Sequence, residues 1–148
     1  INSLSLREVE TFVRYLEIYQ TLTANQGLAS NLIFAFQLLR VFGVYLFCFK
    51  SKIADNITRK LVSADEILNV LAVTDLPKIN LKEYKYPEDH EVVAIMLAKD
   101  CHLGNERFVN LNDEWNTIFI EMFERRYYGS SSPINIIVET IDVLSFKF

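Results

Sequence analysis

The apolar segment at residues 32–49 constrains the fold of this chain more than any other feature. Its side chains are hydrophobic on nearly every side of a helix, and only Gln37 and Arg40 interrupt them. Such a helix is either the centre of a protein core or a membrane span. The clean run from Val41 to Phe49 is too short for a bilayer, which needs about 20 apolar residues. We therefore expect a central core helix over residues 30–50.

The composition favours helices in the rest of the chain as well. Of 148 residues, 51% are hydrophobic, while only four are glycine and three are proline. A chain of this length normally forms one domain with a real core. Scarce glycine and proline leave room for few turns, which is unfavourable for a β-sandwich. The sequence predicts one all-α domain over residues 1–148, a bundle of six to seven helices around the central apolar helix.

Polar residues mark where the helices are expected to begin. Ser5 with Glu8 and Ser63 with Glu66 each have the spacing of a capping box, and Ser132 precedes a proline that suits a first helical position. Glycine at helix ends predicts two stops. The expected starts are residues 5, 30 or 31, 63, 88, 112 or 113 and 132, the expected stops are Gly27 and Gly129, and the aperiodic stretch Thr74 to Pro87 is expected to be an ordered loop.

The sequence lacks the residue patterns of common catalytic and metal sites. No glycine-rich loop leads to Lys-Ser or Lys-Thr, so this chain alone is not expected to bind and hydrolyse a nucleotide. Cys101 and His102 are neighbours, and neighbouring side chains on a helix diverge by about 100°, which prevents convergence on one ion. We therefore predict no catalytic residue and no metal site. Cys48 and Cys101 are expected to be reduced thiols.

A basic stretch follows the apolar helix. Lys50, Lys52, Arg59 and Lys60 are diluted by Asp55, and the whole chain has a net charge of −4. The stretch is a candidate contact for an anionic membrane surface or a phosphate group. A solvated helix end is the alternative, since cations there need no partner. The acidic balance gives no reason to expect nucleic acid as a partner.

Arg7 is the candidate ligand-binding residue. It lies in the first turn of the first predicted helix, where the helix dipole is unfavourable for a cation. A bound anion would explain the placement, because the helix amides and the guanidinium can share it. The alternative is a surface arginine paired with Glu8 or Glu10.

Three stretches resemble the C-terminal helical region of P-loop ATPases of the KAP family. The opening Leu4-Ser5-Leu6-Arg7-Glu8-Val9-Glu10 with Phe12 is similar to the start of the helical lid that follows the nucleotide-binding core. Residues 45–68 are similar in leading from an apolar helix to a Ser-acidic-acidic-Ile-Leu segment. Residues 137–146 resemble the final helix of the family.

The resemblance implies a helical lid, regulatory and interaction domain that is not catalytic alone. It implies a larger protein with an ATPase core in cis that binds ATP and magnesium, and a sensor-like role for Arg7 near the γ-phosphate. Members of the family are typically membrane-associated, and bacterial ones are often linked to phage exclusion. A cytoplasmic location is expected, at the inner membrane face through the parent protein.

A stand-alone helical protein–protein interaction module without nucleotide binding is the alternative. Under the first hypothesis the chain is an excised C-terminal part of a longer protein. One face should then expose an apolar patch, either around Thr74 to Pro87 or near Leu4 and Leu6, which a protein partner or a homodimer would cover.

Overall fold

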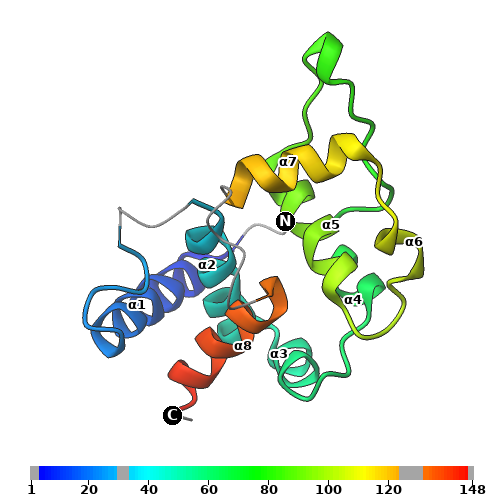
Figure 1. Cartoon of the computed structure of the whole chain (residues 1–148). Helices are drawn as coiled ribbons and strands as arrows, with labels where there is room; N and C mark the ends of the chain where they lie inside the picture. Colours follow the sequence, from blue (N-terminus) through cyan, green and yellow to red (C-terminus); the bar gives the residue numbers. More distant parts are fainter. Residues whose placement is uncertain (1–3, 30–33, 124–131, 147–148) are drawn as a thin grey trace.

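A computed structural model gives the architecture and describes residues 4–29, 34–123 and 132–146. Within these ranges the protein is all-α, with eight α-helices, one 3-10 turn and no strand. Figure 1 shows the arrangement. The elements are α1 (Leu6–Leu22), α2 (Phe34–Phe49), α3 (Ser51–Thr58), α4 (Ala64–Val70), η1 (Leu81–Glu83), α5 (Asp89–Asp100), α6 (Glu106–Val109), α7 (Asp113–Phe123) and α8 (Pro133–Leu144).

Local capping signals place several helix starts as the sequence predicts. Ser5 accepts a hydrogen bond from the Glu8 N–H at 3.2 Å, and the Glu8 carboxylate accepts one from the Ser5 N–H at 3.1 Å, which confirms the capping box of α1. Ser63 caps α4 by accepting from the Glu66 N–H at 3.2 Å. The Glu66 carboxylate instead accepts from Asn56, so only half of the second predicted box forms. Ser132 caps α8 with Pro133 at its start, as predicted.

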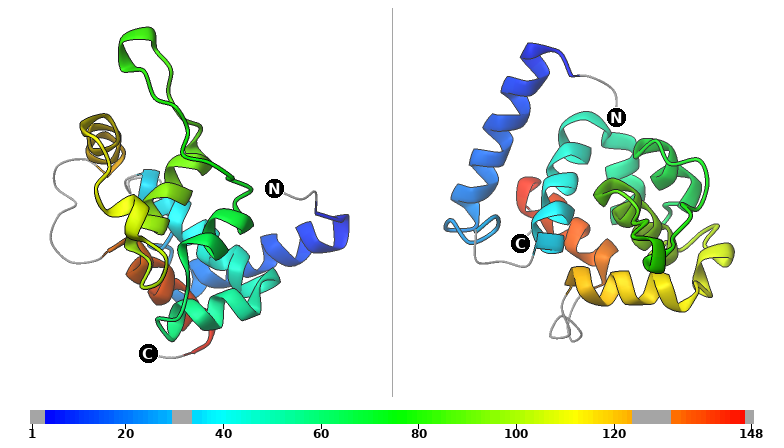
Figure 2. Two further views of the ribbon diagram at one scale, coloured as in Figure 1. Left: turned by 90° about the vertical axis from the view of Figure 1, so that its right-hand side faces the viewer. Right: turned by 90° about the horizontal axis from the view of Figure 1, so that it is seen from above.

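Helix α2 is the centre of the fold, which confirms the predicted core helix. It packs against α1, α3, α5, α7 and α8, and Figure 2 shows α1 lying along one side of it when seen from above. Ala35, Leu39, Val44 and Leu46 of α2 are completely buried. Among the helices that the structure describes, none has the length and apolarity that a bilayer crossing requires. The Ser30 or Asn31 cap and the Gly129 stop lie outside the described residues.

The two polar residues that interrupt α2 hold the preceding loop. Arg40 Nη1 donates to the Gly27 carbonyl at 2.8 Å, and Gln37 Nε2 donates to the Ala29 carbonyl at 2.8 Å. Backbone carbonyls near a core need hydrogen-bond partners. These two side chains therefore provide hydrogen-bond donors for two backbone carbonyls in the segment that follows α1.

Helices α2 and α8 cross closely at a glycine. A Cβ atom placed on Gly43 would lie 3.0 Å from both Cβ and Cγ2 of Thr140, which is tighter than ordinary contact. Thr140 is 1% exposed, and its hydroxyl donates to the Ile136 carbonyl at 2.9 Å. The absence of a side chain at Gly43 thus sets how near α8 approaches.

Helix α5 forms the middle of the second half of the molecule, beside α4 and α6. Every residue from Val92 to Ala98 is buried, so the helix has almost no solvent face over two turns. Its last residue, Asp100, accepts a hydrogen bond from the Ile134 N–H of α8 at 2.8 Å. Asn105 donates to the Cys101 carbonyl at 2.7 Å and so closes the C-terminal end of α5.

The expected number of helices was wrong. The sequence predicts six to seven, whereas α3 and α6 raise the number to eight in the described part of the chain. Helix α3 begins at Ser51, directly after the N-cap residue Lys50, which makes no side-chain cap, and α6 has only four residues. Neither segment has a capping signal or enough turns to show periodicity. Packing of Ile57 and Phe108 into the core stabilises them instead.

Gly27 does not end the first helix as predicted. Helix α1 stops at Leu22 with Thr23 as its cap, and the left-handed conformations fall on Ala24 and Asn25. A Cβ on Gly27 would overlap the Tyr19 ring and lie 2.7 Å from the Thr23 hydroxyl. Close packing against the end of α1 therefore explains this glycine better than turn geometry does.

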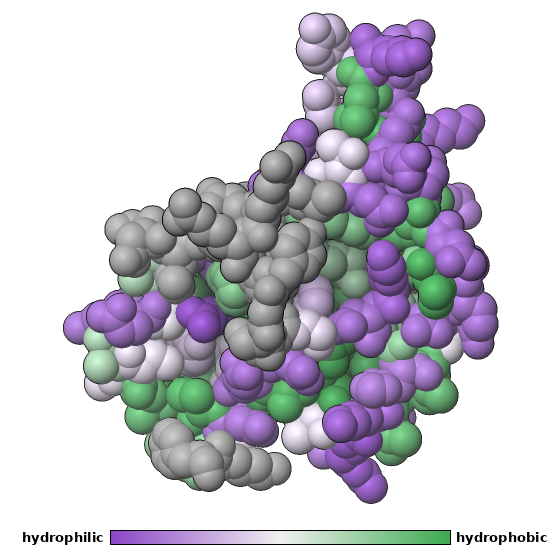
Figure 3. All heavy atoms as spheres, in the orientation of Figure 1, coloured by the Kyte–Doolittle hydropathy of each residue, from purple (hydrophilic) through white to green (hydrophobic). Residues whose placement is uncertain are grey.

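The expected ordered loop projects from the body of the molecule. The middle of residues 74–87 extends beyond the helices in Figure 1 and in the left view of Figure 2, with η1 at the tip, while Ile79 and Leu81 still pack against the core cluster. Asn80 and Lys85 close the tip by a pair of backbone hydrogen bonds, and Tyr84 there is 83% exposed. Figure 3 shows mostly hydrophilic side chains on this projection, with a small hydrophobic area between them.

Candidate functional site

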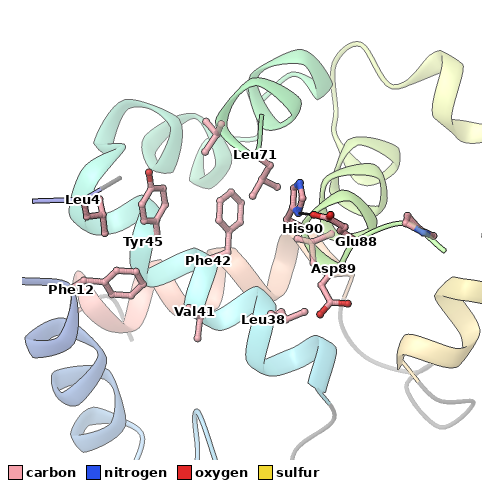
Figure 4. Close-up of a pocket in the computed structure, with 13 residues that line it drawn as sticks. Leu4, Phe12, Leu38, Val41, Phe42, Tyr45, Leu71, Glu88, Asp89 and His90 are labelled. Carbon is pink, nitrogen blue, oxygen red and sulfur yellow. Dashed lines mark ion pairs between the residues drawn. The ribbon is translucent and has the colours of Figure 1, made fainter. Parts of the chain in front are cut away.

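An apolar pocket of about 750 Å³ lies between α2, the start of α1, the end of α4 and the start of α5. This volume is within the usual range of about 300–1,000 Å³ for ligand sites. Figure 4 shows its walls. The lining residues are Leu4, Phe12, Leu38, Val41, Phe42, Tyr45, Val70, Leu71, Pro87, Glu88, Asp89, His90 and Val93.

Aromatic rings from two helices build one wall of the apolar pocket. Phe42 and Tyr45 of α2 are stacked, with centroids 6.3 Å apart and an interplanar angle of 14°. Phe12 of α1 approaches Tyr45 at 6.1 Å, and Phe49 approaches Tyr45 at 5.4 Å. Rings in such mutual contact hold one another in position. The wall is therefore a preformed apolar surface rather than a set of independently moving side chains.

The first turn of α5 provides the polar end of the pocket. Glu88, Asp89 and His90 line it, and Figure 4 shows them on the side away from Leu4 and Phe12. The Glu88 N–H donates to the Glu91 carboxylate at 2.9 Å, which fixes where α5 begins. His90 Nδ1 lies 3.3 Å from Glu88 Oε2, and the Glu88 side chain is 77% exposed. Among the lining residues there is no lysine or arginine.

Helix α1 leaves part of its apolar stripe exposed to solvent. Its residues Phe12, Leu16 and Tyr19 pack toward α2 and α8, where Tyr19 joins Val44 and Leu144 in a small cluster. Leu6 is 76% exposed, and Val9 and Val13 are exposed as well. Phe12, Leu16 and Tyr19 of the predicted apolar stripe are thus packed against the body of the molecule, whereas Leu6, Val9 and Val13 are exposed. The exposed residues agree in position with the expected patch near Leu4 and Leu6, and its covering by a partner stays a prediction.

Arg7 lies on α1 and points into solvent. Its side chain is exposed, and within the described residues its guanidinium makes no ion pair or hydrogen bond. Neither Glu8 nor Glu10 forms an ion pair with Arg7 in the described structure, and Glu8 is engaged in the capping box. Hydrogen bonding to Ser5 holds the pKa of the Glu8 carboxyl below its ordinary value of 4.5. Arg7 is therefore available to an external anion, which stays a prediction.

The structure separates the basic stretch into two pairs. Lys50 and Lys52 lie at the start of α3, whereas Arg59 and Lys60 follow its end. The axial rise over this eight-residue helix is about 12 Å. Arg59 is paired with Asp55 at 3.3 Å, and both side chains are more than 60% exposed. These cations form no single concentrated patch, and their contact with an anionic surface stays a prediction.

The neighbouring Asp100, Cys101 and His102 diverge in the structure. Asp100 binds the α8 backbone, Cys101 is 2% exposed and His102 is exposed. Within the described ranges, no three His, Cys, Asp or Glu side chains come close enough to share a metal ion. Burial raises the pKa of the Cys101 thiol to about 12, and the carboxylates of Asp100 and Glu66 add to the shift. Burial also raises the pKa of Cys48 to about 11, although Arg14 opposes it.

The apolar pocket itself was not predicted from the sequence. Its walls come from four helices, and the spacing of Phe42, Tyr45 and Phe49 on α2 is the same as that of a core-facing stripe. The acidic residues at the start of α5 are equally ordinary, because carboxylates are favoured at a helix N-terminus. Only the tertiary arrangement shows that these two features meet.

Comparison with protein families, with curated proteins and with solved structures finds no match for this chain.

Proposed function

We propose that this chain is a helical interaction domain that binds an amphipathic helix of a partner protein at the apolar pocket. The observation that carries the proposal is the pocket of about 750 Å³ with a preformed aromatic wall of Phe12, Phe42 and Tyr45. Apolar side chains spaced three, four or seven residues apart on a helix are the usual anchors for such a surface. An exposed apolar surface of this kind has the features of a docking site.

The energetics of such docking are adequate. Burial of one leucine or phenylalanine anchor contributes about 1.5–3 kcal/mol. Association costs at least about 4 kcal/mol in lost translational and rotational freedom. Three anchors contribute about 4.5–9 kcal/mol, which leaves at most about 5 kcal/mol after the lowest association cost. This corresponds to a dissociation constant of about 0.2 mM or weaker, the range of a transient contact. Since the rings that form the wall already contact one another, little side-chain ordering opposes binding.

Titration of the isotope-labelled protein with an uncharged amphipathic peptide tests the proposal. The probe is an 18-residue helix of leucine, alanine and glutamine, followed by amide chemical shifts. We expect shifts at α2 and the start of α5. Val41 lines the pocket, so Val41→Gln should weaken binding about tenfold. Val13 is an exposed valine of α1 outside the pocket lining, so Val13→Gln should change the affinity less. Equal affinity of the two variants, or no shifts at the pocket, would refute the proposal.

A second candidate function is the lid of a KAP-type P-loop ATPase, with the ATPase core as the partner in cis. The observation that favours it is the exposed Arg7 guanidinium, which has no ion-pair partner among the described residues. A rigid, always charged side chain on a helix suits recognition of a γ-phosphate by a moving domain. In this case, the apolar pocket and Arg7 would face the same core.

The reading frame upstream of Ile1 provides the first test of this candidate. It should encode a glycine-rich loop that ends in Lys-Ser or Lys-Thr. If it does, Arg7→Ala in the full-length parent should lower ATP turnover about 10- to 1,000-fold, and Arg7→Lys should restore only part of it. Arg14→Ala is the matched control, since Arg14 is an exposed arginine on the same helix. Unchanged turnover in Arg7→Ala would eliminate the sensor role.

A further inference from the structure

We infer that the helix bound at the apolar pocket carries a lysine or arginine beside its apolar anchors, and that this cation docks against Glu88 and Asp89 at the start of α5. The inference rests on the proposed interaction function and adds the charge and the direction of the partner. It follows from the distribution of polar groups around the pocket.

Charge is confined to one end of the pocket. Glu88 and Asp89 are the only carboxylate side chains among the described lining residues, and neither lysine nor arginine accompanies them there. The opposite end is formed by apolar side chains such as Leu4 and Phe12, as Figure 4 shows. A partner helix therefore meets an apolar surface along most of its contact and a negative potential at one end.

Two nearby groups, the N-terminus of α5 and His90, do not cancel this negative potential. The α5 N-terminus contributes about half a positive charge through its dipole, against two carboxylates. His90 lies 3.3 Å from Glu88, in a contact where the Glu88 side chain is 77% exposed. An exposed pair of this kind contributes at most about 1 kcal/mol, so it does not prevent Glu88 from binding another cation. Asp89 is exposed and forms no ion pair with any described residue.

Docking of the apolar anchors strengthens the charge contact. When leucine or phenylalanine side chains fill the pocket, they displace water beside the first turn of α5 and lower the local dielectric constant. A cation at the edge of the docked helix then interacts with both carboxylates. An anion at the same position would be repelled by them, so the pair of carboxylates fixes which end of the partner lies at α5.

Three peptides with identical apolar anchors test the inference on the unaltered protein. They differ only in one terminal residue beside the anchors, which is lysine, glutamine or glutamate. We expect the lysine peptide to bind about fivefold more tightly than the glutamine peptide, and the glutamate peptide to bind more weakly. The differences should shrink at 0.5 M salt, because exposed charges are then screened.

Two protein variants test whether Glu88 and Asp89 produce the preference for the lysine peptide. Asp89→Asn should remove much of the preference for lysine, and Glu88→Gln provides a second test that keeps the backbone hydrogen bond to Glu91. Asp113→Asn is the matched control, because Asp113 is likewise an exposed first-turn aspartate, at the start of α7 and outside the pocket. It should leave the preference intact.

The outcomes separate the inference from the proposed function. Equal affinity for all three peptides would overturn the charge preference while leaving the interaction function standing. Tighter binding of the glutamate peptide would also overturn it. Failure of all three peptides to bind would refute the interaction function itself, and with it this inference.

Discussion

The carboxylate of Asp100, at the end of α5, accepts a hydrogen bond from the backbone N–H of Ile134, in the first turn of α8, at 2.8 Å. These residues are far apart in the sequence, and the bond joins the second half of the molecule to the helix pair at its centre. Because the first N–H groups of a helix have no partner within it, an acceptor from another helix stabilises both the helix start and the interhelical contact.

Replacing Asp100 should weaken this connection in a graded way. Asp100→Ala should lower the free energy of unfolding by about 1–2 kcal/mol, the usual effect of losing a cap, measured by urea denaturation. Asp100→Asn keeps an acceptor oxygen and should cost less. Asp75→Ala provides the control, since Asp75 is exposed in the projecting loop. Equal stability of the alanine variant and the parent would show that the bond contributes nothing.

A methyl group at Gly43 should separate α2 from α8. Alanine is favoured over glycine in a helix by about 1 kcal/mol, but overpacking costs about 1–3 kcal/mol. The neighbouring Thr140 is β-branched and buried, so it has little freedom to move. We expect Gly43→Ala to lower the free energy of unfolding by about 1 kcal/mol. Thr140→Ala in the same chain should make the loss smaller than the sum of the two single effects, and a more stable Gly43→Ala protein would contradict the crossing geometry.

The two thiols should resist alkylation in the folded protein. Burial raises the pKa of Cys101 to about 12 and that of Cys48 to about 11, so the reactive thiolate is scarce at pH 8. Mass spectrometry after iodoacetamide treatment should show slow labelling, slower at the buried Cys101 than at the half-buried Cys48, and rapid labelling of both in guanidinium chloride. The Cys48→Ser variant allows the labelling rate of Cys101 to be measured alone. Fast labelling of Cys101 in the native state would show that α5 opens readily.

The same burial predicts how stability depends on alkaline pH. The ordinary pKa of a cysteine thiol is 9.0, and that of folded Cys101 is about 12. Between these values the unfolded chain loses the proton and the folded chain keeps it, so the free energy of unfolding falls as pH rises above about 9. The parent should therefore lose stability more steeply than Cys101→Ala across this window. Parallel pH profiles would contradict the raised pKa.

The capping box of α1 predicts an effect at acid pH. Hydrogen bonds to Ser5 hold the pKa of Glu8 below 4.5. The Glu8 contribution to stability is present above the unfolded pKa and is lost as pH falls through the lowered folded pKa. NMR titration of the Glu8 carboxyl should give a value below 4.5, and Ser5→Ala should move it upward. Ser5→Ala keeps the backbone N–H that donates to the Glu8 carboxylate, so an identical titration in both proteins would exclude only the Ser5 hydroxyl as a cause.

Sequence-based prediction succeeded where the signal is local. Ser5 and Ser132 are side-chain caps that act within one turn, and the apolar character of α2 already requires a central position. Prediction failed where tertiary packing decides. Helix α3 depends on the burial of Ile57, Gly27 is explained by the Tyr19 ring, and Asp100 binds a backbone group far along the chain.

In the candidate site too, features with a local signal could be predicted from the sequence and features that depend on tertiary packing could not. Arg7 can be identified from its unfavourable place in a first helical turn, and its exposure is visible only in three dimensions. Nothing in the sequence brings Phe42 near Asp89, because aromatic residues on one helix and carboxylates at the start of another are each explained locally. The apolar pocket exists only once α1, α2, α4 and α5 have packed.

The contact between α2 and α8 has a consequence for synthesis on the ribosome. Helix α2 is made early, yet much of its covering comes from α8, which is translated after every other described helix. A nascent chain that contains α1 to α7 therefore leaves the face of α2 that packs against α8 exposed. Chains arrested before α8 should associate with chaperones or aggregate, because the α8-facing side of this apolar helix is then exposed.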